Sequence, residues 1–171
     1  IVTQGHAQRT QEHAVKLARN LNMDQRQIDD LKLLAMFHDI GKVGVPDNIL
    51  FKKGPLTHEE RLKMQRHTEI GHRIAVSSPE LAHISDWILM HHEWWDGSGY
   101  PLGLKGEEIP IQCRILAIVD AYDAMTKDRP YRPALSHEEA VAELKRCAGT
   151  QFDPGLVELF VKILEEETKI A

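Results

Sequence analysis

Apolar residues recur at intervals of three and four along most of this chain, which is the period of an amphipathic helix. The repeat is clear in residues 6–21, and it continues through Ile28, Leu31, Leu34 and Ala35. No segment shows the alternation of apolar and polar residues that is typical of a strand. The sequence therefore predicts an all-α fold.

Capping residues mark three further helix starts. At each start, a hydroxyl or carboxylate side chain is placed to accept hydrogen bonds from the first backbone amides of the helix, which have no partner within the helix. The three are Thr57 with Glu60, Ser136 with Glu139, and Asp153 before Pro154. The apolar segments 79–92 and 110–126 complete a single bundle of about seven helices, which glycine- and proline-rich loops interrupt at 41–56 and 96–110.

Length and charge limit the classes of function. A chain of 171 residues fits one domain, and because it begins in helix-like sequence we expect residues 1–171 to be a unit cut from a longer regulatory protein. The net charge of −5 gives no general attraction to a nucleic acid polymer or an anionic membrane. No apolar run approaches the roughly 20 residues of a membrane span. Cys113 and Cys147 lack disulfide or zinc-ribbon spacing, so a reducing, cytoplasmic location is expected.

Several ionisable residues stand inside apolar sequence. His38 and Asp39 end the run LLAMFHDIGK, His91 and His92 follow ISDWILM, and Asp120 lies within RILAIVDAYDAM. Burying such groups is costly unless they are paired or bind a metal. For each one alone a local role stays open, such as an imidazole that caps a carbonyl or a carboxylate that caps a loop amide.

Once His6 and His67 are included, these residue types come from five predicted helices. Helix bundles build dinuclear sites from such side chains on facing helices. Imidazole and carboxylate without thiolate suit iron, manganese or zinc in an open site, with nickel and other divalent ions left open. Seven side chains are about right for two ions, with Asp39 able to bridge them. Because two ions clamp the attacking and leaving oxygens of a phosphoryl displacement and supply hydroxide at neutral pH, the set predicts phosphoester hydrolysis.

Three segments, HDIGK, HHEWWDGSGYP and VDAYDAMTKDRPYR, together resemble the HD-GYP family of cyclic di-GMP phosphodiesterases, from about His6 to Phe160. A His-Asp pair alone occurs throughout the wider HD superfamily of metal-dependent phosphohydrolases, whereas the GYP segment at this spacing is specific. The resemblance implies the HD-domain fold with a metal site in the bundle core. It also implies a ligand set that agrees with the one above: His6, His38, Asp39, His67, His91, His92 and Asp120.

The same resemblance implies a reaction. It is the hydrolysis of cyclic di-GMP to linear pGpG, with onward cleavage to GMP and the use of mixed cyclic GMP-AMP left open. Beside Asp39 in the catalytic centre, Lys42 matches the family lysine that assists at the phosphate or leaving oxygen. The positions expected to contact the dinucleotide are Asp123, Arg129, Arg132 and Tyr100, the last being the tyrosine of the GYP triplet.

Partners and alternatives follow from the resemblance as well. The loop around Tyr100 is expected to dock a cyclase (GGDEF) domain, and an upstream receiver or sensor domain is expected in the full-length protein. One alternative is a metal-holding sensor of cyclic dinucleotides with negligible turnover, which the intact ligands and Lys42 disfavour. Another is a different HD-superfamily phosphohydrolase that acts on mononucleotides, which the GYP segment disfavours.

One position departs from the pattern of the HD-GYP family. Three-metal members of the family carry a glutamate four residues before the first histidine, where this chain has Val2, so the chain resembles the two-metal members.

Trp94 and Trp95 are predicted to pack against the core rather than to stack on a base. Glu93 could orient a ligand histidine by accepting a hydrogen bond from it, but an exposed position at a helix end is equally consistent with the sequence, so Glu93 is left outside the predicted site.

Overall fold

The computed structural model describes residues 2–128 and 132–170, and these residues are helical throughout apart from turns and loops. The α-helices are α1 (Val2–Asn20), α2 (Gln25–Phe37), α3 (Asp47–Leu50), α4 (His58–Gln65), α5 (His67–Val76), α6 (Ser85–Met90), α7 (Ile111–Met125), α8 (His137–Arg146) and α9 (Pro154–Ile170). Short 3₁₀ helices lie at η1 (Ile40–Gly44), η2 (Ala82–Ile84) and η3 (Gly106–Glu108). Within the described ranges seven α-helices have eight or more residues, which confirms the predicted all-α bundle.

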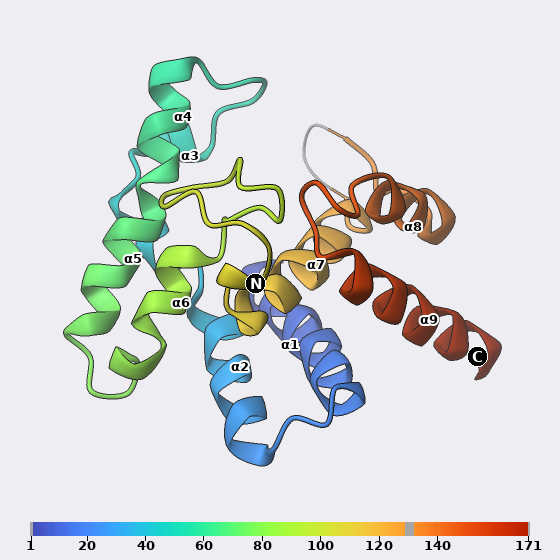
Figure 1. Ribbon diagram of the computed structural model, residues 1–171. Coiled ribbons are helices and arrows are strands. Elements are labelled where there is room, and N and C mark those ends of the chain that lie inside the picture. Colours follow the sequence, from blue (N-terminus) through green and yellow to red (C-terminus); the bar gives the residue numbers. More distant parts are fainter. Residues whose placement is uncertain (1, 129–131, 171) are drawn as a thin grey trace.

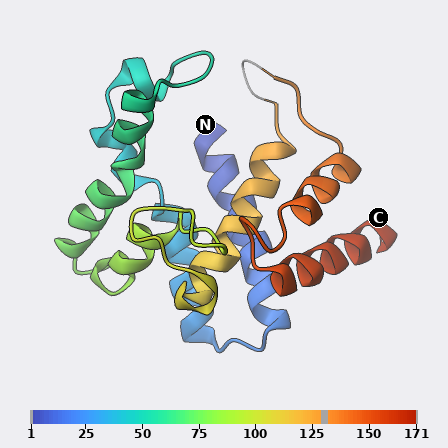
Figure 2. The ribbon, with the colours of Figure 1, turned by 45° about the horizontal axis from the view of Figure 1, so that its top comes forward.

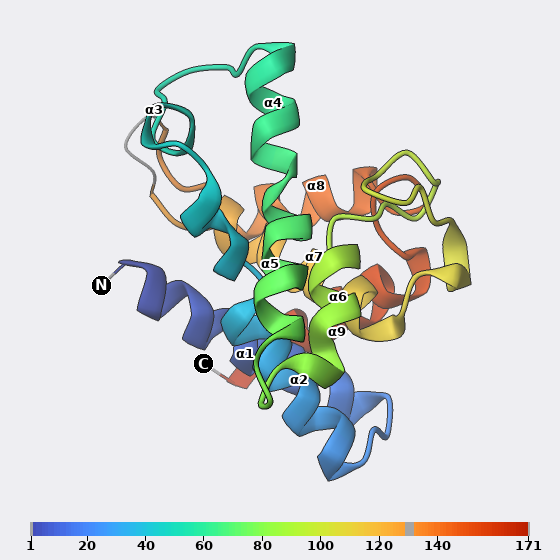
Figure 3. The ribbon, with the colours of Figure 1, turned by 90° about the vertical axis from the view of Figure 1, so that its left-hand side faces the viewer.

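Helices α1 and α7 cross at the centre of the molecule (Figure 1). Helices α5 and α6 lie on one side of this pair and α8 and α9 on the other (Figure 2). Figure 3 shows α4 rising from the start of α5, with α6 packed beside α5. The loop between α6 and α7, which carries the GYP triplet, covers the end of α6. No helix in the described part of the chain is both long and apolar enough to cross a membrane.

The core is formed by the residues that the helical repeat singles out. Leu17, Leu31, Leu34, Ile118 and Phe160 are fully buried and belong to one contiguous cluster. Full burial of such a side chain contributes about 1.5–3 kcal/mol, so the cluster holds α1, α2, α7 and α9 together. The polar residues described below lie at one end of this apolar core.

The predicted helix starts are confirmed. Thr57 and Ser136 each form a reciprocal capping box at the start of α4 and α8. At the start of α9, Asp153 accepts hydrogen bonds from the backbone amides of Gly155 and Leu156.

Gly41, in the HDIGK segment, lets η1 pass unusually close to α5. A Cβ atom at this position would lie 1.8 Å from the carbonyl oxygen of His67 and 2.5 Å from the backbone nitrogen of Gly71. Both of these are backbone atoms, which cannot move aside unless the helix shifts. The glycine therefore sets the distance between the chain that carries His38 and Asp39 and the helix that carries His67.

We expect Gly41→Ala to destabilise the domain at the upper end of the roughly 1–3 kcal/mol typical of overpacking, because α5 must be displaced. Urea unfolding measures the change. Gly44→Ala is the matched control, since the three atoms nearest to a Cβ there all belong to the Ile70 side chain, of which Cδ1 is the closest at 2.8 Å. Equal losses in the two variants would contradict the close-approach explanation.

Candidate metal centre

All seven predicted ligand positions come together in two adjoining groups. Within each group, one ligand atom of every residue lies within 4.8 Å of the others. The first group is Asp39, His67, His91 and His92, and the second is His6, His38 and Asp120. The side chains come from α1, from the turn after α2, from α5, from the end of α6 and from α7. The bundle thus converges five elements on one polar centre.

Asp39 lies between the two groups. Its Oδ1 atom is 3.6 Å from Nε2 of His67 and 3.9 Å from Nε2 of His91, which are in the first group. Its Oδ2 atom is 3.2 Å from Nε2 of His38, in the second group. One carboxylate therefore faces both groups, which is the arrangement of a bridging ligand.

Asp120 organises the second group from α7. Its Oδ1 atom lies 2.7 Å from Nε2 of His6 and 3.4 Å from Nε2 of His38. A histidine from α1 and another from the end of α2 therefore point at the same carboxylate oxygen. With no basic side chain four residues away along α7, Asp120 has these two imidazoles as its partners.

The buried histidines present a free ring nitrogen to the centre. In His38, His67 and His91, the Nδ1 atom lies 2.9, 2.8 and 2.6 Å, respectively, from the backbone carbonyl oxygen three residues earlier. A bond from Nδ1–H to a carbonyl leaves the Nε2 lone pair available as a ligand. Those three Nε2 atoms are buried and make no hydrogen bond to any described residue. Unpaired buried nitrogens aimed at two carboxylates fit a divalent cation, so the residues present suit the metal that an HD domain implies.

Electrostatics differ between the two groups. Burial, reinforced by the neighbouring His92, holds the pKa of His91 well below its usual range, and burial lowers the pKa of His92 to about 4. These imidazoles are therefore neutral near pH 7, which is the form that binds metal. In the second group, hydrogen bonds to Asp120 and Asp123 raise the pKa of His6 to about 9. A cation bound there would take the place of a proton shared with those carboxylates.

Asp123, on α7, is a second carboxylate that contacts the His6 ring, beside Asp120. Its carboxylate contacts Nδ1 of His6 and also accepts a 2.6 Å hydrogen bond from Nε of Arg9. Only 3% of the Asp123 side chain is exposed. Sequence resemblance led us to expect a substrate contact at this residue, whereas its burial and its two partners are those of a group that orients His6. Arg9 had not been singled out from the sequence.

Lys42 and Tyr100 border the first group. The Lys42 ammonium donates to Oδ2 of Asp39 at 3.2 Å, and 41% of the lysine side chain is exposed. The Tyr100 ring stacks on His92 with centroids 5.1 Å apart and an interplanar angle of 16°. Burial, together with the charge of Asp39, raises the pKa of Tyr100 to about 12. The phenol therefore stays protonated near neutral pH.

Glu93 holds the loop that brings Tyr100 to this position. Its side chain is buried, and its two carboxylate oxygens accept 2.7 Å hydrogen bonds from the backbone amides of Leu102 and Leu104. Gly99 allows the same loop to turn back on itself, since a Cβ there would lie 2.3 Å from the backbone nitrogen of Trp94. Glu93 is thus a structural part of the site that the sequence did not reveal.

Of the two arginines expected at the dinucleotide, Arg132 lies within the described residues. Arg132 donates hydrogen bonds to the backbone carbonyls of Ala124 and Pro133, at 3.2 and 3.3 Å. Arg129 lies outside the described residues. The role of both arginines at a phosphate stays a prediction.

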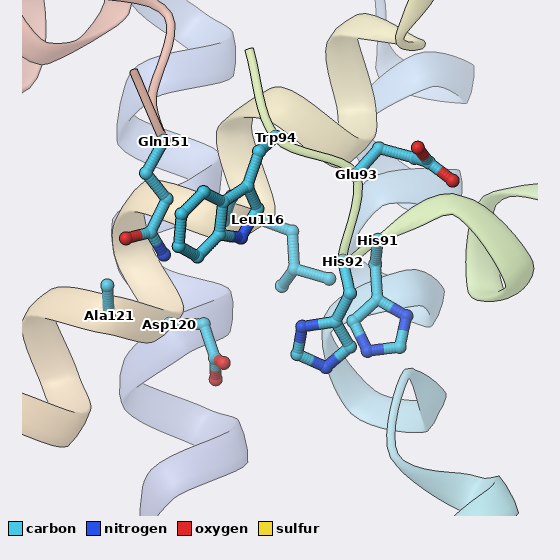
Figure 4. Close-up of a pocket in the computed structure, with 9 residues that line it drawn as sticks. His91, His92, Glu93, Trp94, Leu116, Asp120, Ala121 and Gln151 are labelled. Carbon is cyan, nitrogen blue, oxygen red and sulfur yellow. The ribbon is translucent and has the colours of Figure 1, made fainter. Parts of the chain in front are cut away.

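The predicted burial of Trp94 is wrong. It is 37% exposed and lines a pocket with His91, His92 and Asp120 (Figure 4). Trp95 is half-buried, with the Arg114 guanidinium carbon 5.9 Å from its ring centre. Backbone hydrogen bonds from the loop to residues 150–151 turn the Trp94 indole towards the pocket. The pattern of side chains in the sequence does not indicate such backbone bonds.

Comparison with known proteins agrees with this geometry. The family model described as HD domain matches residues 2–156. The cyclic di-GMP phosphodiesterase of Thermotoga maritima is 42% identical over 170 residues, which cover 98% of this chain and 46% of that protein. The 3′3′-cGAMP-specific phosphodiesterase 2 of Vibrio cholerae is 39% identical over 166 residues, or 96% of this chain and 32% of that protein. The chain thus spans less than half the length of these relatives.

The fold is also similar to that of a solved structure, Bd1817, an HDG"Y"P protein from Bdellovibrio bacteriovorus. The TM-score is 0.72 at 20% identity, over 94% of this chain and 51% of that one. The likeness confirms the predicted bundle. Since the HD domain model spans nearly the whole chain, this chain belongs to the HD domain family, and its HHEWWDGSGYP segment, which resembles the HD-GYP group, lies beside the His-Asp centre.

Proposed function

We propose that this domain hydrolyses a phosphodiester bond of a cyclic dinucleotide, cyclic di-GMP in the first place, to give the linear dinucleotide. The observation that carries the proposal is the convergence of three unpaired, buried Nε2 atoms on two carboxylates, with Asp39 facing both groups. Two of the relatives described above are named as phosphodiesterases of cyclic di-GMP and of 3′3′-cGAMP.

In this proposal each group of ligands would hold one divalent ion, and Asp39 would contribute to both groups. The oxygen- and nitrogen-rich set, with no thiolate, favours iron or manganese, while zinc and nickel are compatible with it. Divalent ions bound in such a pair supply Lewis-acid activation of the phosphate and of water. Val2, at the first position of α1, offers no ligand, so two ions per chain and a linear dinucleotide product are expected.

The chain's own residues then orient the substrate and move a proton. Lys42, at the exposed edge of the centre, donates to a phosphate oxygen and protonates the leaving 3′ oxygen. Tyr100, stacked on His92, donates its phenolic hydrogen to substrate. Arg129 and Arg132 neutralise the second phosphate, for which arginine is well suited.

The partner surfaces belong to the proposal too. The loop held by Glu93 is the segment through which a cyclase (GGDEF) domain would dock, and a receiver or sensor domain would regulate the full-length protein. The location that suits such a signalling enzyme is the cytoplasm.

The direct test is metal analysis coupled to product chromatography. Protein purified with manganese or iron is incubated with cyclic di-GMP and, separately, with 3′3′-cGAMP, and a chelator-treated sample is the control. We expect two ions per chain and the linear dinucleotide as the main product, lost after chelation. Metal-loaded protein that binds both dinucleotides but cleaves neither would instead identify a sensor.

Asp123→Ala is expected to lower metal affinity by about 10–100-fold, the usual cost of losing the hydrogen-bond partner of a ligand histidine. Without Asp123, Nδ1 of His6 has no carboxylate to fix the ring. Calorimetric titration with manganese measures the loss. Glu12→Ala removes an exposed carboxylate from the same helix as His6 and serves as the control. A raised KM for cyclic di-GMP with unchanged metal affinity would instead identify Asp123 as a substrate contact.

A further inference from the structure

A cavity of about 160 Å³ opens beside the metal ligands and is not needed to explain metal binding. One water needs only about 10–15 Å³ of such space, so this cavity has room for a larger, ring-sized group. In Figure 4 the rings of His91 and His92 lie on one side of the cavity, and Trp94 and Gln151 lie together on the other. Asp120 lines it as well, so an occupant would lie next to the metal centre.

The wall away from the histidines combines a flat aromatic surface with an amide. Trp94 and Gln151 are brought together by two backbone hydrogen bonds, from the Trp95 amide to the Gln151 carbonyl at 3.1 Å and from the Asp96 amide to the Thr150 carbonyl at 2.9 Å. Neither the indole N–H of Trp94 nor the side-chain amide of Gln151 makes a hydrogen bond to any described residue. Both polar groups are therefore available to a ligand.

The remaining lining is small and apolar. Ala117 and Ala121, one turn apart on α7, leave space between α7 and the Trp94 ring, and Leu116 closes the inner end. A slot with one aromatic wall, an apolar floor and a few polar groups at its rim is the general form of a site for a flat, partly polar ring. An exposed indole in such a place is more readily explained by a ligand than by packing.

We propose that this cavity receives one nucleobase of the substrate, stacked on Trp94, with the Gln151 amide bonded to an edge of the base. The inference rests on the proposed function, because it takes the phosphate next to that base to lie at the metal centre. The amide of Gln151 carries both a donor and an acceptor, so it can pair with guanine or with adenine. The pocket therefore accepts cyclic di-GMP and 3′3′-cGAMP alike, and it favours a ligand that carries a base over one that carries none.

The test compares two ligands that share a phosphate and differ in the base. GMP and ribose 5-phosphate are titrated calorimetrically into the manganese-loaded protein, into Trp94→Ala and into Trp94→Phe. Base–aromatic stacking is typically worth about 1–3 kcal/mol, so Trp94→Ala should weaken GMP binding by about 5- to 150-fold and leave the binding of ribose 5-phosphate unchanged. Trp94→Phe should retain most of the affinity, and Gln151→Ala should cost GMP a few-fold.

The outcomes separate the pocket from the catalytic proposal. Native protein that binds GMP no better than ribose 5-phosphate, or a Trp94→Ala variant that binds GMP as tightly as native protein, overturns the pocket whether or not cyclic di-GMP is hydrolysed. A Trp94-dependent preference for GMP in a protein that cleaves no cyclic dinucleotide supports the pocket and refutes the proposed hydrolysis. Metal analysis of every variant shows that the two ions are still present.

Discussion

Asp39→Ala is expected to abolish hydrolysis and to release metal at the same time, because the Asp39 carboxylate faces both ligand groups. Its two oxygens lie 3.6 Å from Nε2 of His67 and 3.2 Å from Nε2 of His38. Losing an outer partner of a ligand costs about 10–100-fold in metal affinity, and losing a shared ligand should cost more at each of the two sites. Metal content by mass spectrometry and the rate of cyclic di-GMP hydrolysis measure the two effects.

Two further variants test whether the loss of metal depends on the charge of Asp39 in particular. Asp39→Asn keeps the size of the side chain and removes its charge, so it should fold as the native protein does and still lose metal. Asp86→Ala removes a carboxylate that is 76% exposed on α6, the helix whose end carries His91, and it should change neither metal content nor rate. An Asp39→Asn protein that retains both ions and full activity would refute the bridging role.

The residues that come together at the centre could be predicted because their positions within apolar sequence make them conspicuous. Asp120 interrupts an apolar helix, and His38 and His91 each end an apolar run, so a partner elsewhere in the fold was required. The local alternative for the histidines was also partly right, since Nδ1 of His38 does bond a backbone carbonyl. The two explanations are compatible because an imidazole has two nitrogens, and the local bond at Nδ1 leaves Nε2 available as a ligand.

The supporting residues could not be predicted in the same way. The role of Glu93 depends on the amides of Leu102 and Leu104, which an irregular loop brings back to the end of α6. No periodic pattern indicates such a return. One signal was present, since a loop rich in glycine and proline must satisfy its backbone amides, and Glu93 is an acidic residue next to that loop.

The contacts of Asp123 and Trp94 could not be predicted either, because they also depend on how distant segments meet. Asp123 lies three residues after Asp120, so both carboxylates share one face of α7, and that spacing was visible in the sequence. What the sequence lacked was the crossing of α1 over α7, which brings His6 and Arg9 to that face. Trp94 was assigned to the core because most tryptophans pack there, while backbone pairing with residues 150–151 directs it into the cavity.

Lys42→Ala is expected to keep both ions and to lower turnover by about 10²–10⁴-fold, the range typical of a general acid or base. Removing an ammonium that lies 3.2 Å from Asp39 takes a positive charge away from the cations, so metal affinity should hold or rise. A transition-state role predicts that kcat falls while KM changes little. Steady-state kinetics with cyclic di-GMP, together with metal analysis, measure both quantities.

The control variants separate charge from proton transfer. Lys53→Ala removes an exposed lysine eleven positions along the chain and should leave kcat, KM and metal content unchanged. Lys42→Arg keeps the positive charge but cannot release a proton near neutral pH, so KM should stay near the native value while kcat remains as low as in Lys42→Ala. If Lys42→Ala loses metal, or if Lys42→Arg turns over at the native rate, the lysine acts through its charge on Asp39 and is not the acid for the leaving oxygen.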